Sequence, residues 1–217
     1  LADNAELFHY KLQKESKNAI HIATLAAKQA AGSQWHTNNI SLGAKLVRND
    51  VHSLLEGEKS HTTMDGLYLL NDAQHIDNHT RIDHLVPNTT SNELYKGVLD
   101  DKSHGVFNGK VIVHKDAQKT DSKEYNHNLL LSRECEIDTK PEMEIYADDV
   151  KCGHGSTVGQ LDKDQLFFLR ARGLDEVSAR SLLTHAFAVE VLDRIPNEII
   201  RKAMSSVIEQ QLPTGGR

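Results

Sequence analysis

The 217-residue sequence is poor in aromatic residues, cysteine and proline, and each shortage excludes a class of protein. Aromatic residues make up 5% of the chain, so large rings cannot fill most of a core. The two cysteines, Cys135 and Cys152, are too few for a disulfide scaffold and are typical of a reducing compartment. Four prolines and one Asn-Gly pair, Asn108-Gly109, leave little of the turn chemistry that tight β-hairpins use.

Long apolar runs and excess positive charge are also missing. No uninterrupted apolar run exceeds four residues, which is too short to span a bilayer. The net charge of −6 argues against a general nucleic-acid binder, because such a protein needs a basic surface to displace counterions. We therefore expect a cytoplasmic protein that binds neither nucleic acid nor membrane.

Up to about residue 158, apolar and polar residues alternate with period two, which predicts β-strands with one buried face. In one segment Ile76, Ile82 and Val86 face one way and polar side chains face the other. A further strand is predicted over Leu129–Ile137, with Cys135 among the residues on its apolar face.

About ten such segments follow one another without a helix-length pattern between them. This excludes βαβ winding and leaves a sandwich, a barrel or a β-solenoid. The scarcity of hairpin turns and a spacing compatible with coils of roughly 20–25 residues favour the solenoid. The pattern alone leaves the sandwich open.

Beyond residue 159 the period becomes helical. Asp162 followed by Gln165 predicts the capped start of one helix, and Asp175 predicts the start of a second. A third helix is predicted from Asn197 to about residue 212, with Ala203 on its apolar side.

The change of period predicts a β-core over residues 1–160, a helical domain over 161–212 and a tail over 213–217. Three short helices with apolar stripes cannot bury all of their apolar faces against one another. At least one helical face should therefore pack on the β-region or on a partner.

Standard catalytic signatures are absent from the sequence. No phosphate-binding loop ends in Gly-Lys-Ser/Thr, and no nucleophile elbow or zinc-protease helix is present. The adjacent pairs Asp100-Asp101 and Asp148-Asp149 would point to opposite faces of a strand, so they are interpreted as turn residues rather than an acid and a base. A β-solenoid polysaccharide lyase or hydrolase remains the alternative function.

Thirteen histidines suggest a metal-binding protein as a third hypothesis. His75 and His79 would share one strand face, with His84 on the opposite one. Strand neighbours two or four residues apart are about 7 to 13 Å apart, so a metal would need ligands from adjacent strands. A solvated polar face is the favoured interpretation.

Cys152 and His154 form the most unusual pair. They are separated by one residue, so on a strand they point to the same side, and Gly153 and Gly155 leave room beside them. One interpretation is a half-site for a borderline metal or a cluster, completed by another chain. The other is a packed thiol next to a histidine at a turn.

At these residues the sequence resembles a known family. The segments 138–141 and 144–160 resemble the SufD branch of the SufB/SufD family, the scaffold subunits of the SUF iron–sulfur cluster assembly machine. Segments 74–80, 166–173 and 186–188 and the ending Gln211-Leu-Pro213 also resemble it. The related SufB subunits have Glu where Gly155 stands here. The SufD motif usually has Ser at the place of Gly153 and Ala at that of Ser156.

The resemblance implies a right-handed parallel β-helix followed by a small helical C-terminal domain. It also implies a non-catalytic scaffold, with this chain as the C-terminal portion of a longer subunit. Such a subunit would pair with SufB through the β-helix, or with a second copy when SufB is absent. It would bind the SufC ATPase, which carries the ATPase activity, through the helices.

The resemblance places His154 at the SufB interface, opposite a SufB cysteine, where it is implicated in forming a nascent cluster. His154 is thus a candidate metal ligand shared with SufB, and Cys152 is a weaker one. No cofactor is implied to rest stably on this chain alone. The family associates a nascent iron–sulfur cluster with the partner interface and a reduced flavin with the whole complex.

Overall fold

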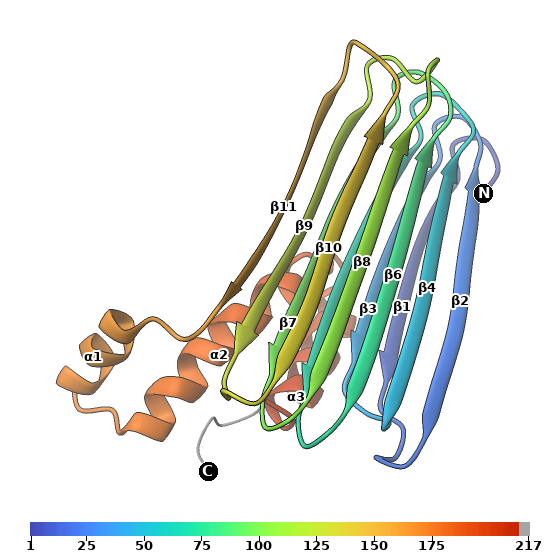
Figure 1. Ribbon diagram of the computed structural model, residues 1–217. Helices are drawn as coiled ribbons and strands as arrows, with labels where there is room; N and C mark the ends of the chain where they lie inside the picture. Colours follow the sequence, from blue (N-terminus) through green and yellow to red (C-terminus); the bar gives the residue numbers. More distant parts are fainter. Residues whose placement is uncertain (213–217) are drawn as a thin grey trace.

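Eleven β-strands are followed by three α-helices in the computed structural model, which describes residues 1–212 (Figure 1). The strands are β1 (Glu6–Gln13), β2 (Ile20–Gln29), β3 (Gln34–Ser41), β4 (Leu46–Leu55), β5 (His61–Leu70), β6 (His75–His84), β7 (Thr90–Leu99), β8 (His104–Val113), β9 (Asp121–Leu130), β10 (Glu136–Ile145) and β11 (Lys151–Gly159). The helices are α1 (Lys163–Ala171), α2 (Glu176–Asp193) and α3 (Glu198–Glu209).

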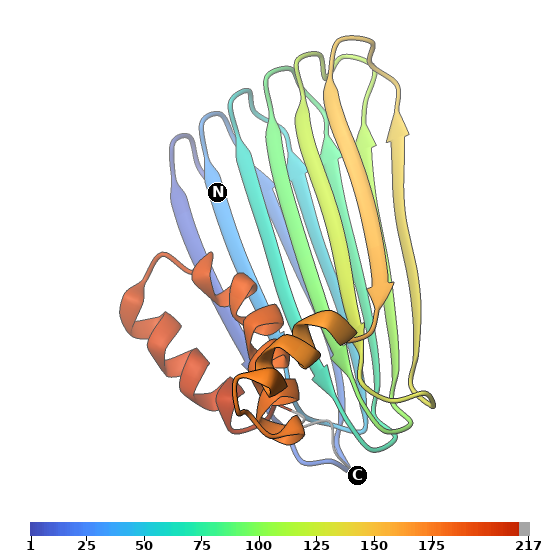
Figure 2. The same cartoon turned by 90° about the vertical axis from the view of Figure 1, so that its left-hand side faces the viewer.

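The strands form two parallel sheets. Odd-numbered strands make one sheet in the order β1-β3-β5-β7-β9-β11, and even-numbered strands make the other in the order β10-β8-β6-β4-β2. The chain passes from one sheet to the other at each turn and advances one strand per coil (Figures 1 and 2). The result is a β-solenoid of about five turns, which confirms the predicted fold class and excludes the sandwich.

The coils are longer than expected. The length of a coil can be measured from hydrogen bonds between side chains at equivalent places in adjacent coils. His36 and Thr63, which form one such bond, are 27 residues apart in the sequence. Ser91 and Ser122, which form another, are 31 residues apart. The expected coil of roughly 20–25 residues was therefore wrong. The reason is that most strands run for 10 residues, so each coil holds two long strands and two turns.

The strand predicted over Leu129–Ile137 was also wrong. β9 ends at Leu130 and β10 begins at Glu136, so this stretch spans the turn between the two sheets. Cys135 lies in that turn, where its thiol donates to the carbonyl oxygens of Leu99 and Ser132. The turn residue Cys135 packs inward like a strand residue, and for that reason the alternation continued past the end of β9. Val86 likewise lies beyond β6, whose inward Ile76 and Ile82 are fully buried as predicted.

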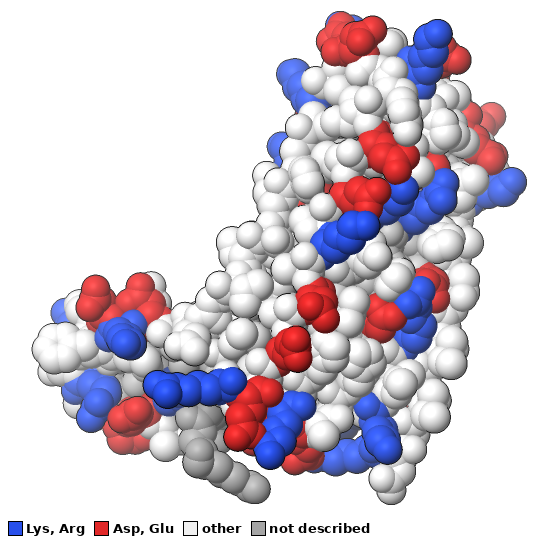
Figure 3. All heavy atoms as spheres, in the orientation of Figure 1, with Lys and Arg blue, Asp and Glu red and all other residues white. Residues whose placement is uncertain are grey.

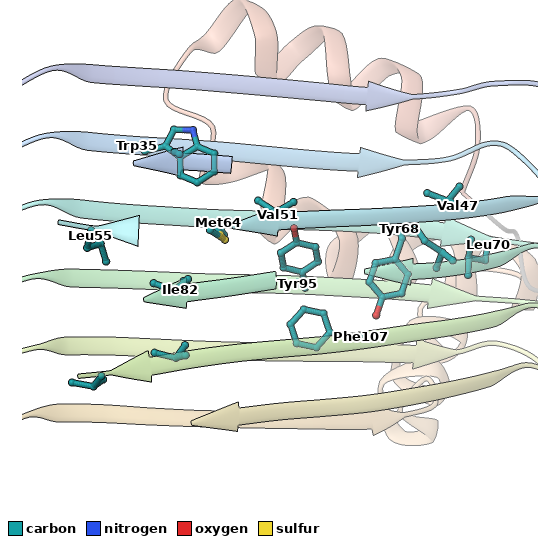
Figure 4. Close-up of a cluster of buried hydrophobic side chains, with 14 of the residues drawn as sticks. Trp35, Val47, Val51, Leu55, Met64, Tyr68, Leu70, Ile82, Tyr95 and Phe107 are labelled. Atoms are coloured by element: carbon teal, nitrogen blue, oxygen red, sulfur yellow. The ribbon is translucent and has the colours of Figure 1, made fainter. Parts of the chain in front are cut away.

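The main core lies between the two sheets. Trp35, Tyr68, Tyr95 and Phe107 are its largest buried side chains, and their rings project between the strands (Figure 4). Glycine makes space for two of these rings: a Cβ at Gly97 would lie 2.2 Å from the ring of Tyr68, and one at Gly66 would lie equally close to Tyr95. Four of the eleven aromatic residues thus lie inside the solenoid, and glycine provides the space for two of their rings.

A second core lies between the helices and the outer face of the odd-numbered sheet. Figure 2 shows that the helices cover one end of that face. Lys96, almost fully buried, reaches from β7 to the carbonyl oxygen of Phe187 and the carboxylate of Glu190, and lies over the Phe187 ring. Arg194 donates to Asp65 of β5. These polar contacts hold α2 at a defined place on the sheet. The apolar face of α2 packs on the outer face of the odd-numbered sheet through Ala188 and Val191, which confirms that a helical face packs on the β-region.

The predicted helix starts are confirmed. Asp162, Asp175 and Asn197 each accept hydrogen bonds from backbone N–H groups in the first turn of their helix. α3 ends at Glu209, and Met204 and Ile208 form its buried face, whereas Ala203 is exposed, contrary to expectation. The predicted tail, 213–217, lies outside the described residues. The proposed domain boundaries stay a prediction.

The outer face of the even-numbered sheet carries mixed charges in pairs (Figure 3). Arg48 pairs with Asp50 and Asp77, and Lys110 pairs with Glu142 and Glu144. These groups are partly exposed, so each pair contributes little to stability but keeps the face polar.

Candidate functional site at the open end of the solenoid

The solenoid ends in two strands with free edges. β11 is the last strand of the odd-numbered sheet and pairs only with β9, while β10 ends the even-numbered sheet and pairs only with β8. In a parallel ladder, residues bond alternately to the strand on either side. Because the N–H of Lys151 donates to Thr120 beside β9, residues 151, 153, 155, 157 and 159 bond toward β9. Cys152, His154, Ser156 and Val158 therefore present their backbone groups to the free edge.

Cys152 is half-buried and packs against the core between the sheets. Burial raises the pKa of its thiol, so the protonated form prevails at neutral pH. The structure thus places the thiol of Cys152 in packing contact with the core.

His154 lies on the same side of β11 as Cys152, as the one-residue separation predicted, but it is exposed. Its imidazole makes no hydrogen bond or ion pair with any residue of the described chain 1–212. Both ring nitrogens are therefore available at the free edge for a metal, a proton or a partner.

The glycines leave the other side of β11 open, as expected. A Cβ at Gly153 would meet no atom within 4 Å, and one at Gly155 would lie 3.5 Å from the ring of Tyr125. Another chain can therefore approach this strand closely along its backbone.

Two residues that the sequence analysis missed lie directly behind His154. Glu124 of β9 is its register partner, and Glu93 of β7 is the register partner of Glu124. Both glutamates point inward and are 0% exposed. Burial raises the pKa of Glu124 to about 8, and burial together with the neighbouring Glu124 raises the pKa of Glu93 well above its usual value. The alternation of apolar and polar residues places both glutamates at positions that face the interior. A glutamate at such a position was the signal in the sequence that could have identified them.

The other histidine and aspartate candidates do not assemble into a site. His84 is fully buried between the hydroxyls of Thr89 and Ser91, and burial lowers its pKa to about 3, whereas His75 and His79 lie on the outer face. Among residues 1–212, no three or more His, Cys, Asp or Glu side chains are arranged to hold a metal ion. Asp100-Asp101 and Asp148-Asp149 lie outside the strands, as interpreted from the sequence.

The helices present a second exposed surface. α1 has no buried residue and contacts α2 at a distance from the solenoid (Figure 1). Phe167 and Phe168 are 75% and 52% exposed, and the guanidinium of Arg172 lies over the Phe168 ring. Large aromatic side chains exposed together are typical of a binding surface. None of the helices in the described part of the chain is long and apolar enough to cross a membrane.

These features define a parallel β-solenoid with a free strand edge at one end and an exposed aromatic surface on its C-terminal helices. A family model described as "SUF system FeS cluster assembly, SufBD core domain" matches residues 1–187. The chain belongs to this family, and within it the chain is SufD-like.

Three relatives illustrate the relationship. The chain is 41% identical over 196 residues to an iron–sulfur cluster assembly SufBD family protein of Synechocystis, covering 90% of this chain and 43% of that protein. It is 36% identical over 217 residues to the iron–sulfur cluster assembly protein SufD of Escherichia coli, covering 100% and 51%. It is 37% identical over 201 residues to the chloroplastic protein ABCI7 of Arabidopsis thaliana, covering 91% and 42%. The chain thus spans about half the length of the curated relatives it matches.

Proposed function

We propose that this chain acts as a non-catalytic scaffold in SUF iron–sulfur cluster assembly, pairing with SufB through the open end of the solenoid. The observation that carries the proposal is the exposed His154 imidazole on a strand whose backbone edge is unpaired. Family membership supports the process, and the absence of blocking side chains at Gly153 and Gly155 supports close approach of a second chain.

A strand edge of this kind binds a partner by extending the sheet. The free N–H and C=O groups of β11 provide main-chain hydrogen bonds, and the alternating side chains provide specificity. SufB is the proposed occupant. A second copy of this chain would use the same edge when SufB is absent.

The helical surface is the proposed docking site for SufC. Phe167 and Phe168 on α1 supply the aromatic contacts that dominate binding energy at many interfaces. Since α1 contacts α2 rather than the strands, a bound ATPase would transmit its movements through α2, which Lys96 and Arg194 fix to the sheet.

His154 is the proposed ligand or proton acceptor for a nascent cluster, which is cargo rather than a resident cofactor. One imidazole and one protonated, half-buried thiol do not complete a cluster's ligand set, so SufB must supply the other ligands. Imidazole is both a metal ligand and a proton carrier near neutral pH. Cys152 contributes chiefly by packing.

The proposal is tested with His154→Ala in cells that lack their own SufD. We expect the variant to co-purify with SufB and SufC, because removing one imidazole from a large interface costs little association energy, yet to leave iron–sulfur enzymes immature. His52→Ala, on the outer face of β4, is the matched control, and Cys152→Ser should have a milder effect. If cells with the His154 variant mature iron–sulfur enzymes fully, His154 has no role in cluster formation. If enzyme maturation is lost only because the complex with SufB and SufC dissociates, the role of His154 is structural.

The carbohydrate-enzyme alternative finds no support. The acidic pairs Asp100-Asp101 and Asp148-Asp149, already rejected from the sequence as its acid and base, lie outside the strands, and the chain belongs to an assembly family.

A further inference from the structure

Glu93 and Glu124 form an acidic pair in the interior of the solenoid. They are register partners on the adjacent strands β7 and β9, and both side chains are 0% exposed. None of their four carboxylate oxygens has a hydrogen-bond donor among the described residues. The buried hydroxyl of Thr80 faces Glu93 from β6 of the opposite sheet and is close enough to oppose the rise in the pKa of Glu93, but it makes no hydrogen bond of normal geometry.

The further charges that act on the pair are also acidic, but each already has a cation of its own. Asp65, which acts on Glu93, pairs with Arg194. Glu142, which acts on Glu124, pairs with Lys110 and Lys140. No Lys, Arg or His within residues 1–212 makes an ion pair with Glu93 or Glu124. Buried carboxylates are strongly unfavourable as anions unless a cation or a proton neutralises them, so this site must take up positive charge in one of these forms.

Packing alone does not explain the two carboxyl groups. The same inward row of the odd-numbered sheet holds Thr37 and Met64 in the preceding coils, so neutral side chains fill the equivalent places. Opposite Glu124, a Cβ at Gly109 would fall 1.8 Å from the carboxylate Oε1. Gly109 thus leaves free the space between the sheets into which this carboxylate projects.

We propose that Glu93, Glu124 and Thr80 form an interior binding site for a small, hard divalent cation of the magnesium, calcium or manganese class. Three strands of two sheets contribute four carboxylate oxygens and one hydroxyl oxygen to this part of the interior, and oxygen is the donor that these cations prefer. The donor set contains no thiolate or imidazole, so the site differs in chemistry from the cluster half-site at His154 and does not depend on the proposed function.

A cation at this place would join three coils. It would neutralise the carboxylates of Glu93 on β7 and Glu124 on β9, and it would bind the hydroxyl of Thr80 on β6 of the opposite sheet. The stacking of the coils next to the open end would then depend on the metal.

Manganese is the probe. The 217-residue chain is refolded with a substoichiometric amount of Mn²⁺, because the site is buried, and the methyl resonances of its methionines are recorded by NMR. Met64 is the register partner of Glu93, whereas Met204 lies on α3 beyond the outer face of the sheet. We expect the Met64 methyl resonance to broaden selectively and Met204 to stay sharp.

Two isosteric variants locate the ligands. Glu93→Gln and Glu124→Gln should each weaken Mn²⁺ binding by about 100-fold, because loss of even an indirect partner of a metal costs about 10- to 100-fold. Glu56→Gln, which alters an exposed carboxylate on the rim, is the matched control and should bind normally. Thr80→Val provides a further test that keeps both glutamates, and it should weaken binding more modestly.

Three outcomes would overturn the proposal. The first is broadening of Met204 as readily as Met64, which would place the ion on the surface. The second is equal binding by the glutamine variants. The third is failure of the refolded wild-type chain to bind Mn²⁺, Ca²⁺ or Mg²⁺ in stoichiometric amount, in which case the pair holds a proton instead.

Discussion

At the scale of single residues, the solenoid interior combines large rings with polar side chains that satisfy one another. The Tyr68 hydroxyl donates to Asn128, and the amide of Asn49 donates to Asn78 across adjacent coils. Satisfied buried polar groups favour one register of stacking, because any slip would break them. Glu93 and Glu124 are exceptions to this rule, because neither oxygen of either carboxyl group has a hydrogen-bond partner, and the first prediction concerns them.

The free energy of unfolding of the metal-free chain should fall as pH rises from about 4.5 to about 8. Glu124 titrates near its usual value of 4.5 in the unfolded chain and near pH 8 in the folded protein, so the folded state binds more protons across this window. Each group contributes a slope of at most about 1.4 kcal/mol per pH unit. Urea unfolding in the presence of EDTA at several pH values measures it.

Glu124→Gln should reduce this slope by the contribution of Glu124 and stabilise the protein at pH 8, whereas Glu56→Gln should leave the slope unchanged. Glu93 and Asp65, whose pKa values burial also raises, maintain the rest of the slope in the variant. The comparison with a variant is needed because the buried His84 contributes the opposite slope below its usual pKa of 6.5. Identical pH profiles for the wild type and the Glu124 variant would contradict the prediction.

A second prediction at the scale of single residues concerns the packing of the aromatic rings in the core. Gly97→Ala should destabilise the protein by about 1–3 kcal/mol, because the added methyl group would lie 2.2 Å from the ring of the fully buried Tyr68. Gly153→Ala on the edge strand β11 is the matched control, since its methyl group would meet nothing within 4 Å. The stability of the two variants is compared by their midpoints of denaturant unfolding. Equal midpoints would show that the core rearranges to accommodate the methyl group and would contradict the prediction.

At the scale of elements, the helices do two different things. α2 and α3 close the second core over the outer face of the odd-numbered sheet, where Leu67 and Val98 are fully covered. α1 buries nothing and exposes two phenylalanines. Removal of residues 161–217 would therefore uncover an apolar sheet face as well as delete the proposed SufC site, so point substitutions on α1 are the cleaner test.

Phe167→Ser combined with Phe168→Ser should weaken SufC binding by tenfold or more, because aromatic anchors at an interface are commonly worth about 2 kcal/mol each or more. The fold should be unchanged, since neither ring is buried. Ile199→Ser on α3, where the isoleucine is 81% exposed, is a matched control that should bind normally. Binding is measured by titration of purified SufC, and unchanged affinity of the double variant would place the SufC site elsewhere.

At the scale of the whole molecule, the solenoid is an open stack rather than a closed unit. β10 and β11 leave one end of both sheets without a neighbouring strand, and His154 lies on β11 at that end. An exposed strand edge of this kind can pair with another chain, and it promotes aggregation unless a partner covers it. The fourth prediction tests the edge itself rather than any one side chain.

Ser156→Pro should abolish pairing with SufB while leaving the chain folded. The Ser156 N–H points to the free edge, so proline removes a donor for the partner but none from the ladder with β9. Ser156→Ala keeps the N–H and should pair normally. Pull-down measures pairing, and circular dichroism with thermal melting reports the fold. A proline variant that is folded and still pairs would exclude β11 as the docking edge.

Much of this architecture could be predicted from the sequence, because local chemistry decides it. Alternation with Ile76 and Ile82 inward identified strands, and Asp162 and Asp175 marked helix starts through side-chain bonds to nearby N–H groups. The shared side of Cys152 and His154 followed from the period of a strand. Each of these depends on residues a few positions apart, which the sequence shows directly.

The tertiary structure alone decided what depends on register between coils. The sequence could not place the strand ends around Cys135, because an inward-packing turn continues the alternation of the strands it joins. It could not bring Glu93, Glu124 and His154 into one row, since these residues are about 30 positions apart and only the coil length aligns them. Nor could it show that His154 is exposed while Cys152 is packed, because burial at an edge strand depends on whether another strand follows it.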